Sequence, residues 1–183
     1  RPPAGQIYSI HLAGPFLFAT TGGGNFISRD DGDSWTAAES MCLGVKKVRW
    51  LREIDGNLFA DVSPDILLRS SDNGLSWTAA NAGLPKRTSI TTFITRGSAL
   101  FAGTWEAGVF YSTDAGARWK AVGPGLPNKT QFTDLAASGT NLLAVMGFEG
   151  GPIYISTYSG SKWTRWRQGE LKFVESLEKR EKY

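Results

Sequence analysis

Short apolar runs recur along the chain at a regular interval, separated by glycine and small polar residues. One set begins with leucine, at residues 17–20, 58–61, 100–103 and 142–145. A second set follows within a few residues and ends in serine, at residues 25–28, 67–70, 109–112 and 153–156. A further run precedes each pair, as at residues 90–94 and 132–136. Short runs rich in β-branched and aromatic residues and bounded by turn residues predict strands rather than helices.

After each serine-ending run, an eight-residue segment leads from that serine to a tryptophan; we call it the box. The four boxes are residues 28–35, 70–77, 112–119 and 156–163, and their serines are 42, 42 and 44 residues apart. With the strand that carries each tryptophan onward, a repeat holds four strands, which is the unit of a propeller blade. The sequence therefore predicts an all-β propeller of about four four-stranded blades over residues 1–168.

The box residues have structural roles in this interpretation. Glycine supplies a positive φ, aspartate accepts backbone N–H bonds within the turn, and tryptophan covers the seam between strands. The residues that fill these roles are Ser28, Asp30, Gly32, Trp35, Ser70, Asp72, Gly74, Trp77, Ser112, Asp114, Gly116, Trp119, Ser156, Gly160 and Trp163. The fourth box departs, because Tyr158 stands where the aspartate is expected.

The pattern Ser-x-Asp-x-Gly-x-x-Trp resembles the Asp-box, or BNR repeat, over residues 7–163. The families that carry it include sialidases, xyloglucan-cleaving glycoside hydrolases, sortilin-type receptors and photosystem II assembly factors. The resemblance implies a β-propeller and an extracellular or periplasmic, secreted protein. It does not select one function, because one fold hosts many activities.

Charge is concentrated at the end of the chain. The chain has 20 basic and 17 acidic residues, a net charge of +3. From residue 162 onward there are seven basic and four acidic residues, so the net charge of the remainder is zero. Nucleic-acid binding needs a concentrated positive surface, which this body does not offer. Residues 169–183 form a charged C-terminal tail outside the repeats, and no apolar run is long enough to span a membrane.

Metal and cofactor chemistry find little support in the sequence. His11 is the only histidine and Cys42 the only cysteine, so no zinc ligand set forms. No nucleophile elbow and no phosphate loop occur. We expect no cofactor and no metal.

Glycoside hydrolysis is the enzymatic alternative, because it requires only two carboxylates across a cleft. The candidates are Asp61, Glu106 and Glu149, which we expect just after the leucine-led strands, at one end of the propeller channel. The sialidase motif Arg-Ile-Pro is absent, and the chain is short for a xyloglucanase.

A non-catalytic interaction module is the main expectation. The loops after the leucine-led strands carry Trp105, Glu106, Phe148 and Glu149. Aromatic side chains beside polar groups on one rim are typical of protein or carbohydrate contacts. We therefore expect a protein or glycan partner at these four residues.

The sequence does not determine how the propeller closes. Four blades could form a small closed ring in which blade one contacts blade four, near Phe26 and Tyr154. Two chains could instead complete a ring as a homo-oligomer, or the blades could continue in a longer chain.

Overall fold

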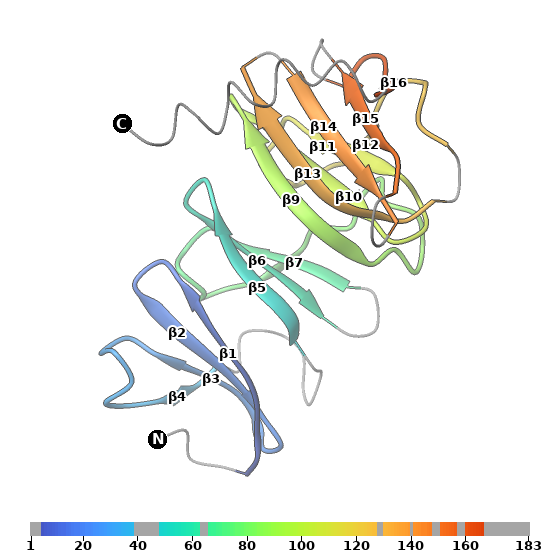
Figure 1. The fold of residues 1–183 in the computed structure, drawn as a ribbon. Coiled ribbons are helices and arrows are strands. Elements are labelled where there is room, and N and C mark those ends of the chain that lie inside the picture. Colours follow the sequence, from blue (N-terminus) through green and yellow to red (C-terminus); the bar gives the residue numbers. More distant parts are fainter. Residues whose placement is uncertain are drawn as a thin grey trace, which may run out of the picture.

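The computed structural model describes residues 5–38, 48–62, 66–127, 130–139, 141–147, 151–156 and 160–166. This part of the chain contains strands and no helix, and the strands form four sheets (Figure 1). Expectations for Tyr158 and for the tail at 169–183 lie outside the described residues.

Each sheet uses four strands that follow one another in the sequence. The first sheet contains β1 (Ile7–Ala13), β2 (Phe16–Thr21), β3 (Gly24–Ser28) and β4 (Thr36–Ala37). The second contains β5 (Val48–Ile54), β6 (Asn57–Val62), β7 (Ile66–Ser70) and β8 (Thr78–Ala79). The third contains β9 (Ile90–Arg96), β10 (Ala99–Thr104), β11 (Val109–Ser112) and β12 (Lys120–Ala121). The fourth contains β13 (Phe132–Ser138), β14 (Asn141–Met146), β15 (Ile153–Ser156) and β16 (Thr164–Arg165).

All pairings within the sheets are antiparallel and join strands in sequence order. This confirms the predicted unit of four strands per repeat. Short turns reverse the chain between consecutive strands, so each strand pairs with the next one in the sequence.

The register repeats from sheet to sheet. Near the middle of each first strand, one apolar residue pairs with an alanine of the second strand: Ile10 with Ala19, Leu51 with Ala60, Phe93 with Ala102 and Leu135 with Ala144. Each first strand also has a register shift beside its second strand. Residues at equal positions can therefore be compared directly between sheets.

The hydrophobic core lies between the sheets in three clusters. One joins the first and second sheets, with Phe18 packed edge-on against Trp77. The next joins the second and third sheets, with Phe59 beside Phe93. The last joins the third and fourth sheets around Phe101. The fold is thus held together by face-to-face packing of successive sheets.

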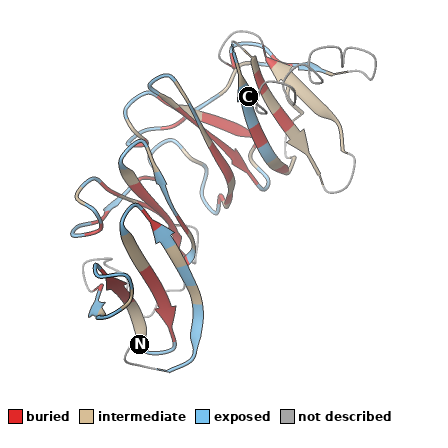
Figure 2. Cartoon of the chain, turned by 60° about the vertical axis from the view of Figure 1, so that its left-hand side comes forward, coloured by how far each residue is buried: buried red, intermediate tan, exposed pale blue. Residues whose placement is uncertain are grey.

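The four sheets follow an arc, with the first and fourth at opposite ends (Figures 1 and 2). The first and second sheets meet where β1 contacts β5, and the third and fourth meet where β9 and β10 contact β13. Among the described residues, no apolar cluster joins the fourth sheet to the first. The closed four-bladed ring is therefore wrong for this structure: Phe26 and Tyr154 belong to sheets at the two ends of the arc.

Candidate functional site

The boxes form the turns between the third and fourth strands of the sheets. In the first box, the Ser28 hydroxyl donates to Asp30 Oδ1 at 2.8 Å and accepts the Gly32 N–H at 2.8 Å. Asp30 Oδ1 also accepts the Ser34 N–H at 2.8 Å. The second and third boxes repeat these three bonds within 0.1 Å, at Asp72 and Asp114. The three carboxylates serve separate turns and do not converge on one cleft.

Hydrogen bonding lowers the pKa of the box carboxyls. For Asp30 and Asp72 it lowers the pKa to about 2, first through the serine hydroxyl of Ser34 or Ser76 and then through that residue's N–H. For Asp114 the pKa is also lowered, led by the Arg118 N–H. Arginine at position 118 has no hydroxyl to donate. Each bond stabilises the ionised form, so these groups are acceptors at neutral pH.

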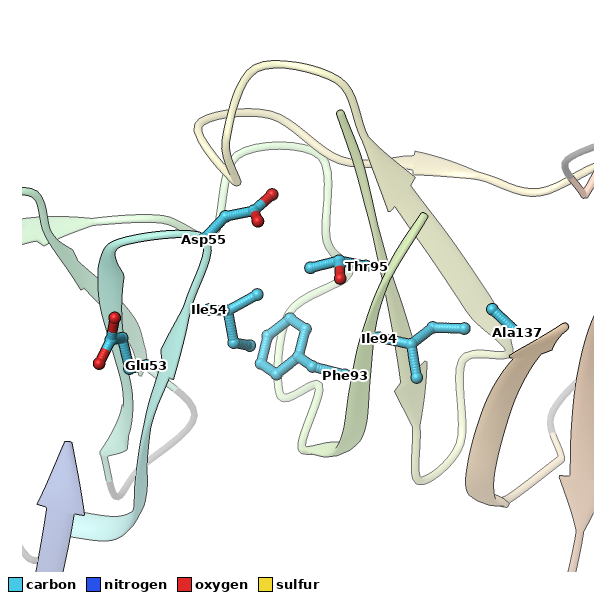
Figure 3. A pocket seen from close by; sticks show the side chains of 7 residues that line it. All are labelled: Glu53, Ile54, Asp55, Phe93, Ile94, Thr95 and Ala137. Carbon is cyan, nitrogen blue, oxygen red and sulfur yellow. The ribbon is translucent and has the colours of Figure 1, made fainter. Parts of the chain in front are cut away.

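An open hollow lies along the row of first strands, between the second and third sheets (Figure 3). Its volume is about 470 Å³, which is in the range of small ligand sites. The lining residues are Glu53, Ile54, Asp55, Phe93, Ile94, Thr95 and Ala137. They come from the end of β5 and the β5–β6 turn, from β9 and from β13, so three repeats build this site.

The hollow combines the apolar side chains of Ile54 and Phe93 with acidic and polar groups. Ile54 lies beside Phe93 across the gap between the sheets, and Asp55 lies above them (Figure 3). Glu53 is on the other side of Ile54, and its carboxylate points in a different direction from that of Asp55. None of the lining residues is basic. The two carboxylates therefore do not face each other as a hydrolytic pair would, and the hollow fits an apolar group with a cation beside it.

The turn residue Asp55 has a positive φ of 51°. Asp and Asn adopt this left-handed conformation more readily than other non-glycine residues, so the sequence at the turn fixes where the carboxylate stands. The following Gly56 also has a positive φ, of 69°. The turn type thus places one acid at the edge of the hollow.

Of the three carboxylates predicted from the sequence, the two that the structure describes, Asp61 and Glu106, lie in different surroundings. Asp61 lies within β6 rather than after it, and it is buried, with its Oδ1 2.7 Å from Nη2 of Arg49. Glu106 is exposed in the loop after β10. Glu149 lies outside the described residues. Asp61 was expected just after the strand, but it is the last residue of the run at 58–61, and β6 continues past it to Val62, so the sheet rather than a loop positions its side chain.

The loop candidates for binding are partly described. Trp105 is exposed, and its N–H donates to the Ser89 carbonyl at 2.9 Å, which fixes the backbone of this loop. Glu106 follows it in the chain, while Phe148 lies outside the described residues. The loop is at the opposite strand ends from the hollow, because it follows the C-terminal end of β10, whereas the hollow lies near the β5–β6 turn.

His11 is a half-buried residue of β1. Burial lowers the pKa of His11, and its Nε2 lies 3.1 Å from Ser9 Oγ within the same strand. No group of three His, Cys, Asp or Glu side chains suited to a metal ion occurs in the part of the chain that the structure describes. Within the same ranges there is no helix with the length and hydrophobicity needed to cross a membrane.

Sequence reasoning missed the hollow. The signal that could have found it is the register: Glu53, Thr95 and Ala137 each pair with the leucine that is the second residue of the second strand of their sheet. These three residues occupy equal positions in successive first strands and line the same hollow. An acid, a threonine and an alanine at one such position indicate an exposed, uneven row rather than core.

The comparisons with known proteins agree with this architecture. Residues 58–176 match the family described as the DUF6242 beta propeller domain, which is more than half of the chain. The chain belongs to this family. No curated protein matches the sequence.

Solved propellers share the fold at low identity. YCF48 from Cyanidioschyzon merolae has a TM-score of 0.56 at 14% identity, covering 92% of this chain and 58% of that protein. YCF48 bound to a D1 peptide has a TM-score of 0.55 at 15% identity, and the match covers 91% of this chain and 55% of that protein. The GH74 xyloglucanase from Xanthomonas campestris has a TM-score of 0.60 at 16% identity, and the match covers 90% of this chain and 30% of that protein. The extracellular domain of BT4673 from B. thetaiotaomicron has a TM-score of 0.63 at 10% identity, and the match covers 93% of this chain and 24% of that protein. The chain therefore spans between a quarter and three fifths of these proteins, and the likeness shows the fold alone.

Proposed function

We propose that the chain is a non-catalytic propeller module that binds a segment of another protein in the hollow between β5 and β9. The observation that carries the proposal is the composition of the hollow, with the apolar side chains of Ile54 and Phe93 together with Asp55 at its edge. An apolar lining takes a buried anchor side chain, and an unopposed carboxylate at the rim selects a basic neighbour.

The preferred segment pairs an apolar residue with lysine or arginine. A glycan is a poorer fit, because sugar sites present the faces of aromatic rings, whereas Phe93 is 8% exposed and packs against Trp50, Phe59 and Trp119, so only a small part of its ring reaches the hollow. The peptide-bound state of YCF48 supports the proposal as a precedent for peptide recognition on this fold. Trp105 and Glu106 are proposed as a second contact region for the same partner, because the Trp105 side chain is exposed.

Hydrolysis is not proposed. In the described residues, Asp61 is committed to Arg49 and Glu106 is exposed, so neither supplies the close carboxylate pair that glycoside cleavage requires. Cleavage of xyloglucan oligosaccharides by the purified chain would contradict the non-catalytic proposal.

Binding can be tested with fluorescent nonapeptides measured by fluorescence polarisation. One set pairs leucine or phenylalanine with arginine, and a matched set replaces the arginine with glutamate. We expect the basic set to bind with dissociation constants in the micromolar range, which corresponds to a binding free energy of about −8 kcal/mol. The acidic set should bind at least about tenfold more weakly. Added salt should weaken the basic set, since the carboxylate is near solvent.

The variant Asp55→Asn removes the charge and keeps a residue that tolerates the left-handed turn. It should weaken the basic peptides by about three- to tenfold, which is about 1 kcal/mol. Asp31→Asn is the matched control, because Asp31 also has a positive φ, of 55°, but lies in the first box, away from the hollow. Thr95→Arg places a cation in the hollow and should abolish binding of the basic set. Equal affinity of both peptide sets, or no effect of Thr95→Arg, would rule out this site.

We also propose an extracellular or periplasmic location. The similar fold of the extracellular domain of BT4673 supports it. Detection of the native protein only in the cytoplasmic fraction of its source cells would contradict it.

A further inference from the structure

The first sheet exposes a face that the other three sheets bury. We call it the leading face, and it consists of Ile7, Ile10, Leu17, Gly32 and Trp35. Ile10 is 53% exposed, whereas Leu51, Phe93 and Leu135 at the same register position are 4, 8 and 5% exposed.

The same contrast holds at the other apolar positions of this face. Ile7 is 41% exposed, and its equivalents Val48, Ile90 and Phe132 are at most 4% exposed. Leu17 and Trp35 are half-buried, while the leucines and tryptophans at their positions in the other sheets are buried: Leu58, Leu100, Leu142, Trp77, Trp119 and Trp163. In the second, third and fourth sheets, the preceding sheet covers these positions.

The preceding sheet covers them in one consistent way, by placing a phenylalanine ring on the box glycine. A Cβ built on Gly74 would lie 2.9 Å from Phe18 Cζ, and one built on Gly160 would lie 3.2 Å from Phe101 Cε1. At Gly32 the nearest atom is Leu17 Cδ1 of the same sheet, at 3.5 Å. The surface at Gly32 therefore lacks the contact that a side chain of the preceding sheet makes with the box glycine at the three contacts between sheets.

The fourth sheet has side chains at the positions that contact the box glycine of the next sheet. We call them the trailing face, which consists of Leu143 and Trp166. Leu143 has the register position of Phe18, Phe59 and Phe101. Trp166 has the position of Val122, since both donate their N–H to the first residue of the third strand. Val122 Cγ1 lies 3.3 Å from a Cβ built on Gly160, so this position also reaches the next box. Both Leu143 and Trp166 are half-buried.

We propose that the leading face of one copy of the chain packs against the trailing face of a second copy. Within one copy the two faces lie at opposite ends of the arc and do not meet (Figures 1 and 2). The contact continues the internal junctions, with Leu143 and Trp166 of one copy against Gly32 and Ile10 of the other. Because the two faces differ, the association is head-to-tail, and it ends in a ring where the rotation closes. Burial of the exposed isoleucine side chains and of the half-buried tryptophan side chains drives it.

Sedimentation velocity on the whole chain tests this association across protein concentration. We expect dimers or larger species for the natural sequence. Ile10→Lys should raise the dissociation constant by at least about 100-fold, because it places a charge in an apolar contact. Leu143→Lys should do the same from the other face. Leu75→Lys is the matched control: Leu75 is also an exposed leucine, but it lies in the second box and on neither face.

Mixing gives the decisive result. Ile10→Lys keeps an intact trailing face and Leu143→Lys an intact leading face, so an equimolar mixture should form a one-to-one dimer although each variant alone is a monomer. Thermal melts establish that each variant is folded, and Trp166→Ala replaces Leu143→Lys if the latter unfolds. A folded natural chain that stays monomeric at about 100 μM would overturn the proposal and leave a further repeat of a longer polypeptide as the occupant. Self-association that survives both lysine variants would also overturn it.

Discussion

Gly116 of the third sheet lies directly against the ring of Phe59 of the second, so that a Cβ on this glycine would be 2.7 Å from Phe59 Cε1. The same glycine has a φ of 82°, which its turn requires. One residue thus serves two needs, a tight turn within its own sheet and a close approach to its neighbour.

Replacement of Gly116 by alanine separates these two needs when it is compared with Gly32→Ala. Both positions have a positive φ, but at Gly32 the nearest atom to a new Cβ would be 3.5 Å away. Both variants should lose stability through backbone strain, and Gly116→Ala should lose about 1–3 kcal/mol more through overpacking. Urea unfolding followed by tryptophan fluorescence measures the difference. Equal losses would mean that the Phe59 contact contributes nothing.

The buried serine hydroxyls of the boxes are the next testable feature. Ser70 is 2% exposed, and its hydroxyl both donates to Asp72 and accepts from Gly74. Ser70→Ala leaves that N–H without its acceptor, so we expect a loss of about 1–3 kcal/mol of unfolding free energy. Its exposed neighbour Ser71 provides the control, and Ser71→Ala should change stability by less than about 0.5 kcal/mol. A thermal melt of both variants shows whether the hydroxyl matters.

Ionisation of the box aspartates should depend on the residue four positions later. Ser76→Ala removes the hydroxyl that contributes most to the lowered pKa of Asp72, which is about 2 in the natural chain, so that pKa should rise. Arg118→Ser supplies a hydroxyl to Asp114, and its pKa should fall. Carbon-detected NMR titration of the carboxyl groups reads both. Unchanged titration midpoints in the two variants would contradict this assignment.

The sign for stability follows from the lowered pKa values. A carboxyl whose pKa is lower in the folded than in the unfolded chain stabilises the fold fully above its unfolded pKa of about 4. That contribution is lost as the pH falls through about 4 to the folded value, which is about 2 for Asp30 and Asp72. The natural chain should therefore be less stable at pH 2 than at pH 6, and Ser76→Ala should narrow this difference.

The local parts of the fold could be predicted from the sequence because local chemistry determines them. The run at 67–70 became Ile66–Ser70, and the run at 109–112 became Val109–Ser112. Strand alternation, turn glycines and the order of residues in the box all act within one repeat. The four-stranded unit followed from them directly.

The site could not be predicted in the same way, because it depends on how repeats pack together. The hollow joins Asp55, Phe93 and Ala137 from three repeats, and nothing within one repeat marks them. The open arc likewise depends on contacts between repeats, such as the ring contact between Phe59 and Phe93. Asp61 is a further case: its sequence position suggested a loop acid, but Arg49 of the neighbouring strand binds it.

The final prediction compares one register position in two sheets. Leu51 and Ile10 both pair with an alanine of the second strand, yet Leu51 is 4% exposed and Ile10 is 53% exposed. Leu51→Ala should leave a cavity between the first and second sheets and cost about 2–5 kcal/mol. Ile10→Ala should cost less than about 0.5 kcal/mol when unfolding is measured at submicromolar concentration, where copies are apart. At high concentration its cost should grow, because the natural chain then gains stability from association and the variant gains less. Differential scanning fluorimetry over a concentration series separates the two effects. A cost for Ile10→Ala that is large and independent of concentration would mean that Ile10 is covered within a single copy.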